Sequence, residues 1–277
     1  MDRLRFGTAG IPYDTPNRNT INGIKYVRKL GLESMELEFV RSVNISEDAA
    51  PEIKKTAKAN DVVLTCHAPY FINLNAIEKP KIYASMHRIL NSAKIANLCG
   101  GYSVTFHAGF YLKMDPKKVF ENIRKRIKEI SKKLIDEGNN IWIRPEVTGK
   151  FSQFGTIEEI LKLSQEIENV MPCVDFAHQH AKTGKYNTYE EFSEILESIE
   201  KSLGKEGLNN MHIHVSGIEY TEKGERRHLI LDDSDMNYKD LMKAFKDYKI
   251  KGVVTCESPV IDEDSLLMQR TYNKIYK

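Results

Sequence analysis

The chain lacks the features that mark secreted and membrane proteins. Its four cysteines lie far apart and form no CxxC pair, so we expect them to be small buried side chains in a reducing compartment. No run reaches the roughly 18 apolar residues of a membrane span, and the first 14 residues hold no apolar signal region. We therefore expect a cytoplasmic protein without a membrane partner, and the sequence indicates no obligate protein partner.

An excess of charge of one sign is also missing. The 41 basic and 39 acidic residues leave a net charge of +2, so binding to nucleic acid would need cationic side chains gathered on one face. The first apolar run continues into GTAGIPYD, which is not the GxGxxG loop that a doubly wound sheet usually carries there. No Pro-, Gly- or Ser-rich linker divides the chain.

What the sequence does contain is a repeated pattern of short apolar runs. Their starts are 28 to 41 residues apart, and amphipathic stretches such as 116–138 and 188–207 lie between most of them. The eight runs cover residues 5–10, 34–39, 62–68, 102–108, 141–146, 172–178, 211–216 and 252–258. Eight β-then-α units predict an α/β protein with one (β/α)₈ TIM-barrel domain over residues 1–277. A doubly wound sheet, the alternative, would not need eight units.

Ligand-type side chains recur at the ends of these runs. Six successive predicted strands carry His67, His107, Glu146, Asp175, His212 and Glu257. Four more histidines, His178, His180, His214 and His228, lie on the loops or strands just beyond, and His87 falls on a predicted helix. Because the carboxyl ends of barrel strands surround the active-site mouth, we expect a shared metal or catalytic site there.

The mixture of imidazoles and carboxylates is typical of zinc, manganese or iron sites. Strand alternation turns Cys66 and Cys256 away from their neighbours His67 and Glu257, which argues against these two thiols as ligands. The set exceeds what one tetrahedral ion can use, and a multinuclear site suits phosphoryl displacement. A single-metal sugar or sugar-phosphate isomerase or epimerase is the main alternative, and a non-catalytic metal-stabilised binding protein is a third.

Six motifs, CHAPYFINL, VTFHAGF, RPEVTGKFSQFG, CVDFAHQHA, HIHVSG and TCESP, give the chain a recognisable signature. In order and spacing this set resembles the endonuclease IV family of apurinic/apyrimidinic (AP) nucleases, within the xylose-isomerase-like barrels. The resemblance spans about residues 60 to 260 and is loose in the first two strands. It implies a zinc-dependent hydrolase that cuts duplex DNA 5′ to an abasic site during base excision repair.

The resemblance also implies a role for each matching residue. His67 and His107 would bind a first zinc, and Glu146 would bridge to a second zinc held by Asp175, His212 and Glu257. His178 would bind a third zinc, with Mn²⁺ as an alternative metal throughout. Glu146 and Glu257 are the candidate catalytic residues, and Tyr70 would enter the DNA near the lesion.

One segment departs from the family pattern, which supplies Asp-x-His to the third zinc. Here the loop after the seventh strand offers Glu225 and His228, with one extra residue between them, and Arg226 and Arg227 are candidate DNA contacts. Three zinc ions against four carboxylates leave a cationic site, whereas two ions leave it near neutral and less suited to a DNA backbone. The roles of His180 and His214 stay open at this point.

Overall fold

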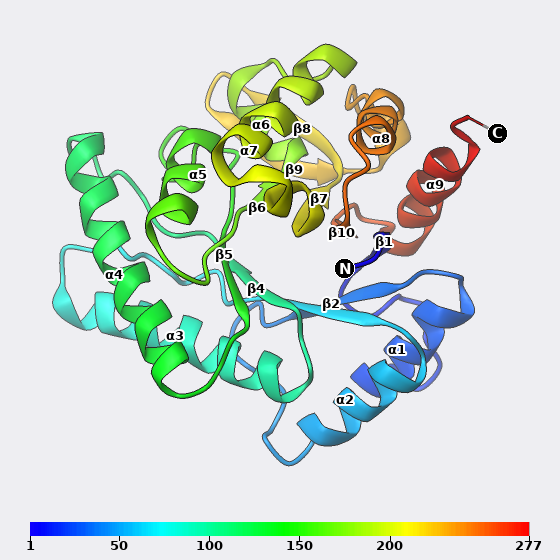
Figure 1. Cartoon of the computed structure of the whole chain (residues 1–277), viewed down its shortest axis with the longest axis horizontal. Coiled ribbons are helices and arrows are strands. Elements are labelled where there is room, and N and C mark those ends of the chain that lie inside the picture. Colours follow the sequence, from blue (N-terminus) through cyan, green and yellow to red (C-terminus); the bar gives the residue numbers. More distant parts are fainter. Residues whose placement is uncertain (277) are drawn as a thin grey trace.

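Eight parallel strands form the centre of the computed structural model, which describes residues 1–276. They are β1 (Leu4–Ala9), β2 (Ser34–Glu38), β3 (Val63–His67), β4 (Ser103–Phe106), β5 (Trp142–Pro145), β6 (Cys173–Asp175), β7 (Met211–Val215) and β10 (Gly252–Cys256). Their order in the sheet is β5-β4-β3-β2-β1-β10-β7-β6. In Figure 1 the strands lie at the centre of the molecule, inside a ring of helices.

The two ends of the sheet, β5 and β6, meet and nearly close it into a barrel. Ile143 and Glu146 form isolated parallel bridges to Val170 and Cys173, and the Met171 amide donates to the Ile143 carbonyl over 3.1 Å. The predicted TIM barrel is therefore confirmed, and each of the eight apolar runs overlaps one of its strands.

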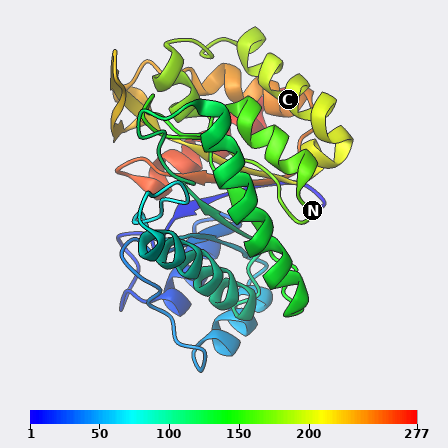
Figure 2. The same ribbon diagram turned by 90° about the vertical axis from the view of Figure 1, so that its left-hand side faces the viewer.

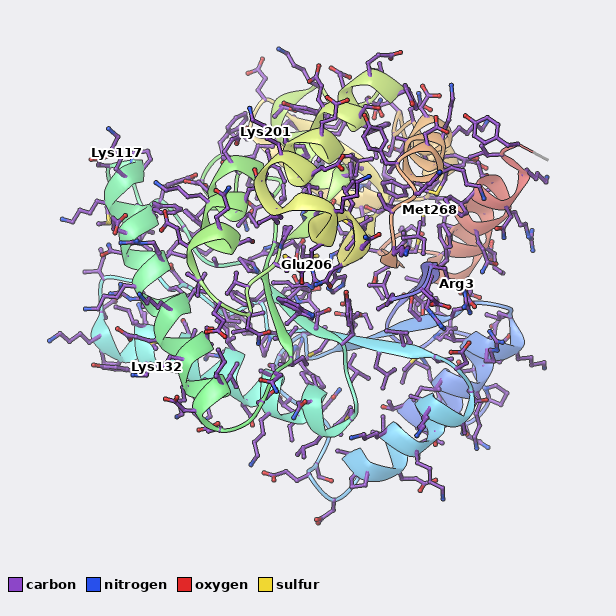
Figure 3. All side chains as sticks on the ribbon, viewed as in Figure 1. Arg3, Lys117, Lys132, Lys201, Glu206 and Met268 are labelled. Atoms are coloured by element: carbon purple, nitrogen blue, oxygen red, sulfur yellow. The ribbon has the colours of Figure 1, made fainter. Side chains whose placement is uncertain are left out.

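Nine α-helices lie within the described part of the chain. They are α1 (Thr20–Lys29), α2 (Ala50–Ala59), α3 (Lys79–Leu98), α4 (Pro116–Asp136), α5 (Ile157–Glu166), α6 (Phe176–Thr183), α7 (Tyr189–Asn209), α8 (Tyr238–Asp247) and α9 (Ile261–Lys274), with a 3₁₀ turn η1 (Leu231–Asp233). In α4 the buried residues recur every three or four positions, and Lys117 and Lys132 project outward (Figure 3). None of the helices in residues 1–276 is long and apolar enough to cross a membrane.

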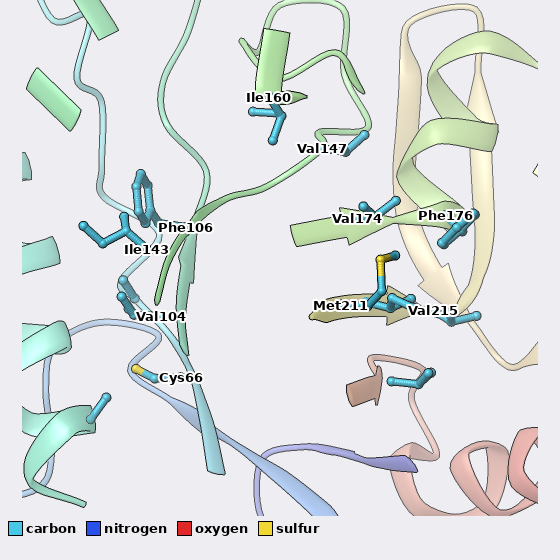
Figure 4. Packing of buried hydrophobic residues seen from close by; sticks show 14 of the residues in the cluster. Cys66, Val104, Phe106, Ile143, Val147, Ile160, Val174, Phe176, Met211 and Val215 are labelled. Atoms are coloured by element: carbon cyan, nitrogen blue, oxygen red, sulfur yellow. The ribbon is translucent and has the colours of Figure 1, made fainter. Parts of the chain in front are cut away.

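The hydrophobic core lies between the outer face of the barrel and the helices (Figure 4). Strand alternation places Cys66 and Cys256 in this layer, as predicted, while His67 turns inward. The inward faces carry many polar groups; Arg144, for example, is fully buried and donates to the Pro172 and Asn210 carbonyls. Barrel interiors are usually filled by apolar side chains, so these polar groups indicate a functional site on the barrel axis.

The segment after β7 forms a hairpin where the sequence led us to expect a loop. Strands β8 (Gly217–Thr221) and β9 (Gly224–Leu229) pair antiparallel, with an irregularity between Glu219 and Tyr220. Figure 2 shows the hairpin at the left edge of the molecule and the N-terminus on the right. Because β1 starts beside the N-terminus and all barrel strands are parallel, the hairpin stands over their carboxyl ends.

Candidate metal centre

The first ligand group joins the ends of β3, β4 and β5. His67 Nε2 lies 3.2 Å from Glu146 Oε2, and His107 Nε2 lies 3.2 Å from Glu146 Oε1. His67 Nδ1 lies 2.7 Å from the Ala68 carbonyl, to which it donates, so the lone pair on Nε2 is free for a metal. Neither buried oxygen of Glu146 has a hydrogen-bond partner within residues 1–276, which is the state expected of a bridging metal ligand.

A second group shares Glu146 and extends toward β6, β7 and β10. Ligand atoms of Glu146, Asp175, His214 and Glu257 all lie within 4.8 Å of one another. His214 Nδ1 is 3.4 Å from Glu257 Oε2 and 3.6 Å from Glu146 Oε1. Three carboxylates and one imidazole around a point form a donor set that fits a divalent cation.

The structure differs from our expectation at His212, which we predicted in this second group. Its Nε2 faces Glu36 at 3.0 Å, and its Nδ1 faces the Ser103 hydroxyl at 3.0 Å. Both histidines of β7 point into the barrel, but His212 pairs in register with Cys173, whereas His214 pairs with Asp175. The His212 side chain therefore lies one inward-facing position further from the carboxyl ends of the strands than His214 does. His214 reaches the second group instead.

The third group brings the hairpin to α6. His178 Nε2 and His228 Nε2 face each other at 3.4 Å, and Glu225 Oε2 lies 3.5 Å from His178 Nε2. Each ring donates its Nδ1 hydrogen to a backbone carbonyl, that of Val147 at 3.1 Å and that of Glu257 at 3.0 Å. In the metal-free protein the proton on His178 can lie between these two nitrogens, and a third metal would take its place, so the geometry fits such an ion.

Local backbone geometry explains how Glu225 reaches this group despite its shifted spacing. The Glu225 amide donates to the Gly149 carbonyl over 2.9 Å. A Cβ on residue 149 would lie 2.7 Å from Glu225 Cβ and 2.9 Å from His178 Cδ2, so only glycine admits this approach. Gly224 has φ of 92° and permits the turn that precedes β9. Asp175 serves twice, because Oδ1 also accepts the His178 amide at 2.7 Å as the cap of α6.

A model of the family described as xylose isomerase-like TIM barrel matches residues 24–271. The chain belongs to this family. An uncharacterised protein of Methanocaldococcus jannaschii is 44% identical over 273 residues, covering 98% of both chains. A probable endonuclease 4 of Oceanobacillus iheyensis is 26% identical over 183 residues, covering 64% of this chain and 58% of that protein. The family match and this endonuclease relative confirm the resemblance seen in the motifs.

Two solved structures show how widely this xylose isomerase-like fold is shared. Endonuclease IV from Thermus thermophilus matches with a TM-score of 0.72 and 19% identity, covering 97% of both chains. A D-tagatose 3-epimerase-like protein also matches with a TM-score of 0.72, at 16% identity, covering 98% of this chain and 97% of its own. The fold alone therefore does not separate nuclease from epimerase.

Two acidic residues of β2 were missed by our reading of the sequence. Glu36 reaches across the barrel to both histidines of β7, with Oε1 lying 2.9 Å from His214 Nε2. Burial, together with the charge of Glu36, raises the pKa of Glu38 to about 8. The signal was present in MELEF, where both glutamates fall on the face opposite to Met35 and Leu37.

The remaining candidates lie around the centre without joining it. His180 Nε2 lies 3.3 Å from Asp235 Oδ2, and its Nδ1 donates to the Lys185 carbonyl. The Tyr70 side chain is 55% exposed, and its ring packs edge-on against His67 with centroids 5.4 Å apart. The exposed side chains of Arg226 and Arg227 both contact Glu219 on the hairpin.

Metal uptake by this protein should be coupled to proton release. Burial lowers the pKa of His67 and of His178, but Glu146 for the former and Asp175 and Glu146 for the latter outweigh it and raise each pKa to about 10. Both rings are therefore protonated at pH 7 in the metal-free protein, and metal ligands must be neutral. Burial also lowers the pKa of His214, but Cys173 and Glu257 outweigh it and raise that pKa well above its usual value. We therefore expect at least two protons, and about three when His214 is counted, to be released as the ions bind at pH 7.

The same shifts set the direction of the pH dependence. Unfolded histidine has a pKa of about 6.5, so the protonated rings stabilise the metal-free fold below that pH, and this contribution is lost as pH rises toward 10. Apparent metal affinity should rise over the same window. Calorimetry in buffers of different ionisation enthalpy measures the proton count, and a heat of binding independent of the buffer would contradict the expectation.

Proposed function

We propose that this chain is a metal-dependent AP endonuclease that hydrolyses the phosphodiester 5′ to abasic sites in duplex DNA. The proposal rests on the observation that the three ligand groups are joined by shared residues. Glu146 belongs to the first and second, and Asp175 belongs to the second and third. We call the nine residues together the metal centre: His67, His107, Glu146, Asp175, His178, His214, Glu225, His228 and Glu257.

The charge of the metal centre favours an anionic substrate. Its four carboxylates carry −4, and three divalent ions would bring +6, which leaves about +2 to meet a phosphodiester and its developing transition-state charge. The imidazole-rich donor set suits zinc, with manganese as the second candidate. When bound, such ions lower the pKa of water and stabilise the leaving oxygen of an in-line displacement.

The residues of the chain fix where this chemistry takes place. Glu146 is shared by the first and second groups, so it would hold an ion in each of them. Glu257 closes the second group, and its own carbonyl accepts the hydrogen bond that orients His228. Both carboxylates thereby act as catalytic residues, since they would touch the ions that hold the reacting phosphate.

DNA contacts would come from side chains around the mouth. We assign Tyr70 to the edge of the lesion, because its exposed ring stands against His67 at the rim. Arg226 and Arg227, exposed on β9 beside Glu225, would contact backbone phosphates. We propose that residues 1–277 act as one TIM-barrel domain in this reaction, with abasic duplex DNA as the partner.

The test is a nicking assay on a duplex with one synthetic abasic site, combined with metal analysis. We expect strand cleavage 5′ to the site, loss of cleavage with a chelator, and recovery with zinc or manganese. At least three ions per chain should be present in active protein. An undamaged duplex is the control, and absence of nicking by metal-loaded protein would overturn the proposal.

A ketose epimerase or isomerase is the second candidate, favoured by the equal structural match to the D-tagatose 3-epimerase-like protein. The group of Glu146, Asp175, His214 and Glu257 would by itself hold the single ion that such an enzyme needs. That function leaves His178, Glu225 and His228 without a role, because a neutral sugar needs no third cation. One tightly bound ion, no nicking and turnover of a ketose would establish it.

A further inference from the structure

A second buried group of ligand-type side chains lies on the barrel axis beneath the metal centre. It consists of Glu36, Cys173, His212 and His214, which we call the inner cluster. Each of the four is at most 1% exposed. Cys173 and His212 are register partners on β6 and β7, and ligand atoms of Cys173, His212 and His214 lie within 4.8 Å of one another.

Glu36 completes the inner cluster from the opposite side of the barrel. Its Oε2 lies 3.0 Å from His212 Nε2, and its Oε1 lies 2.9 Å from His214 Nε2. None of these four atoms has a hydrogen bond of acceptable geometry to a partner within residues 1–276, although all are buried. Two imidazole nitrogens and two carboxylate oxygens therefore converge between the side chains without well-aligned hydrogen bonds.

The metal centre shows the same arrangement. His67 Nε2 and Glu146 Oε2 lie 3.2 Å apart, and that oxygen also lacks a hydrogen-bond partner. Ligand atoms in tetrahedral array at 2.0–2.2 Å from zinc are about 3.3 Å from one another. The two separations between Glu36 and the histidines, 3.0 and 2.9 Å, are slightly shorter than this, whereas Cys173 lies within 4.8 Å of ligand atoms of both histidines. The side chains would therefore have to adjust to bring all four ligands around one ion.

We propose that the inner cluster binds a further metal ion, of the zinc class, through the Cys173 thiolate, His212 Nε2, His214 Nε2 and a Glu36 oxygen. The metal centre holds no cysteine, so the inner site differs from it in chemistry as well as in place. A thiolate with two imidazoles and a carboxylate is a donor set that selects zinc over magnesium or calcium.

Charge and burial both favour a structural ion here. The thiolate, the carboxylate and the shared imidazolate of His214 balance a divalent cation to within one charge, which limits the net charge left in the interior. All four positions are filled by protein, as in structural zinc sites, and no open position remains for substrate. His214 would be shared as an imidazolate that has released its remaining ring proton to solvent, with Nδ1 facing the metal centre and Nε2 facing the inner ion, so the inner ion would fix the orientation of that ring.

The test uses cobalt in place of zinc, because a thiolate bound to Co²⁺ gives a near-ultraviolet charge-transfer band that imidazole and carboxylate ligands do not. The fully loaded wild-type protein should show this band. Cys173→Ala should abolish it and lower the metal content by one ion per chain. Cys66→Ala is the matched control, since Cys66 is equally buried on another barrel strand, β3, but packs in the hydrophobic core.

X-ray absorption of the zinc-loaded wild-type protein supplies a measurement that needs no variant. We expect a sulfur scatterer at about 2.3 Å from part of the zinc. Absence of both the sulfur scatterer and the cobalt band overturns the proposal, and so does a band that survives in folded Cys173→Ala. The result is independent of the nicking assay, so failure of this proposal is distinguishable from failure of the proposed function.

Discussion

Replacing Glu146 with glutamine is expected to lower nicking at an abasic site by about 10³-fold or more while the barrel remains folded. The neutral amide has one oxygen and no charge, so it cannot serve as an anionic ligand in both the first and the second group. The first two ions would lose their bridge, and the distance between them would no longer be fixed. Burial raises the pKa of Glu146, but His107 and His214 hold it well below its usual range, so the side chain being replaced is an anion.

The measurement is single-turnover nicking with saturating metal, together with metal content and circular dichroism. Glu159→Gln makes a matched control, because it is the same chemical change in the capping box of α5, away from the metal centre. Glu159 accepts the Gly155 and Thr156 amides, so its loss should cost about 1 kcal/mol of stability and leave nicking intact. Nicking at the wild-type rate by Glu146→Gln would remove the bridging role.

The barrel could be predicted because its pattern is local and repeated eight times. Six of the eight apolar runs carry a ligand-type residue at the same rim, and parallel strands then bring distant positions such as His67 and Glu257 together without further information. What strand alternation cannot give is depth along the axis. His212 and His214 share one face of β7, and only the register with β6 shows which of them reaches the mouth.

Contacts that depend on long-range packing could likewise not be predicted from the sequence. Glu36 meets His212 and His214 from across the barrel, and no spacing within the chain indicates that approach. The hairpin is another case, since its position over α6 depends on the bare backbone of Gly149. That position is what brings Glu225 near His178 in spite of the extra residue before His228.

Two histidines of α6 allow the third group to be tested by nearly identical substitutions. His178→Asn should remove one ion per chain and lower nicking by about 10²-fold or more, because His178 contacts Asp175, Glu146 and Glu225 within 3.5 Å. Loss of a divalent ion takes the charge of the loaded metal centre from about +2 to near zero. Binding of the phosphodiester should weaken with it, so KM should rise as kcat falls.

His180→Asn is the control, two residues further along the same helix. His180 is as buried as His178, but its nitrogens face Asp235 and the Lys185 carbonyl rather than the metal centre. Metal content and nicking should therefore match wild type in His180→Asn, while both fall in His178→Asn. Equal losses in the two variants would point to a general effect on α6 and contradict the third group; full activity in His178→Asn with the ion count unchanged would exclude that histidine as a ligand.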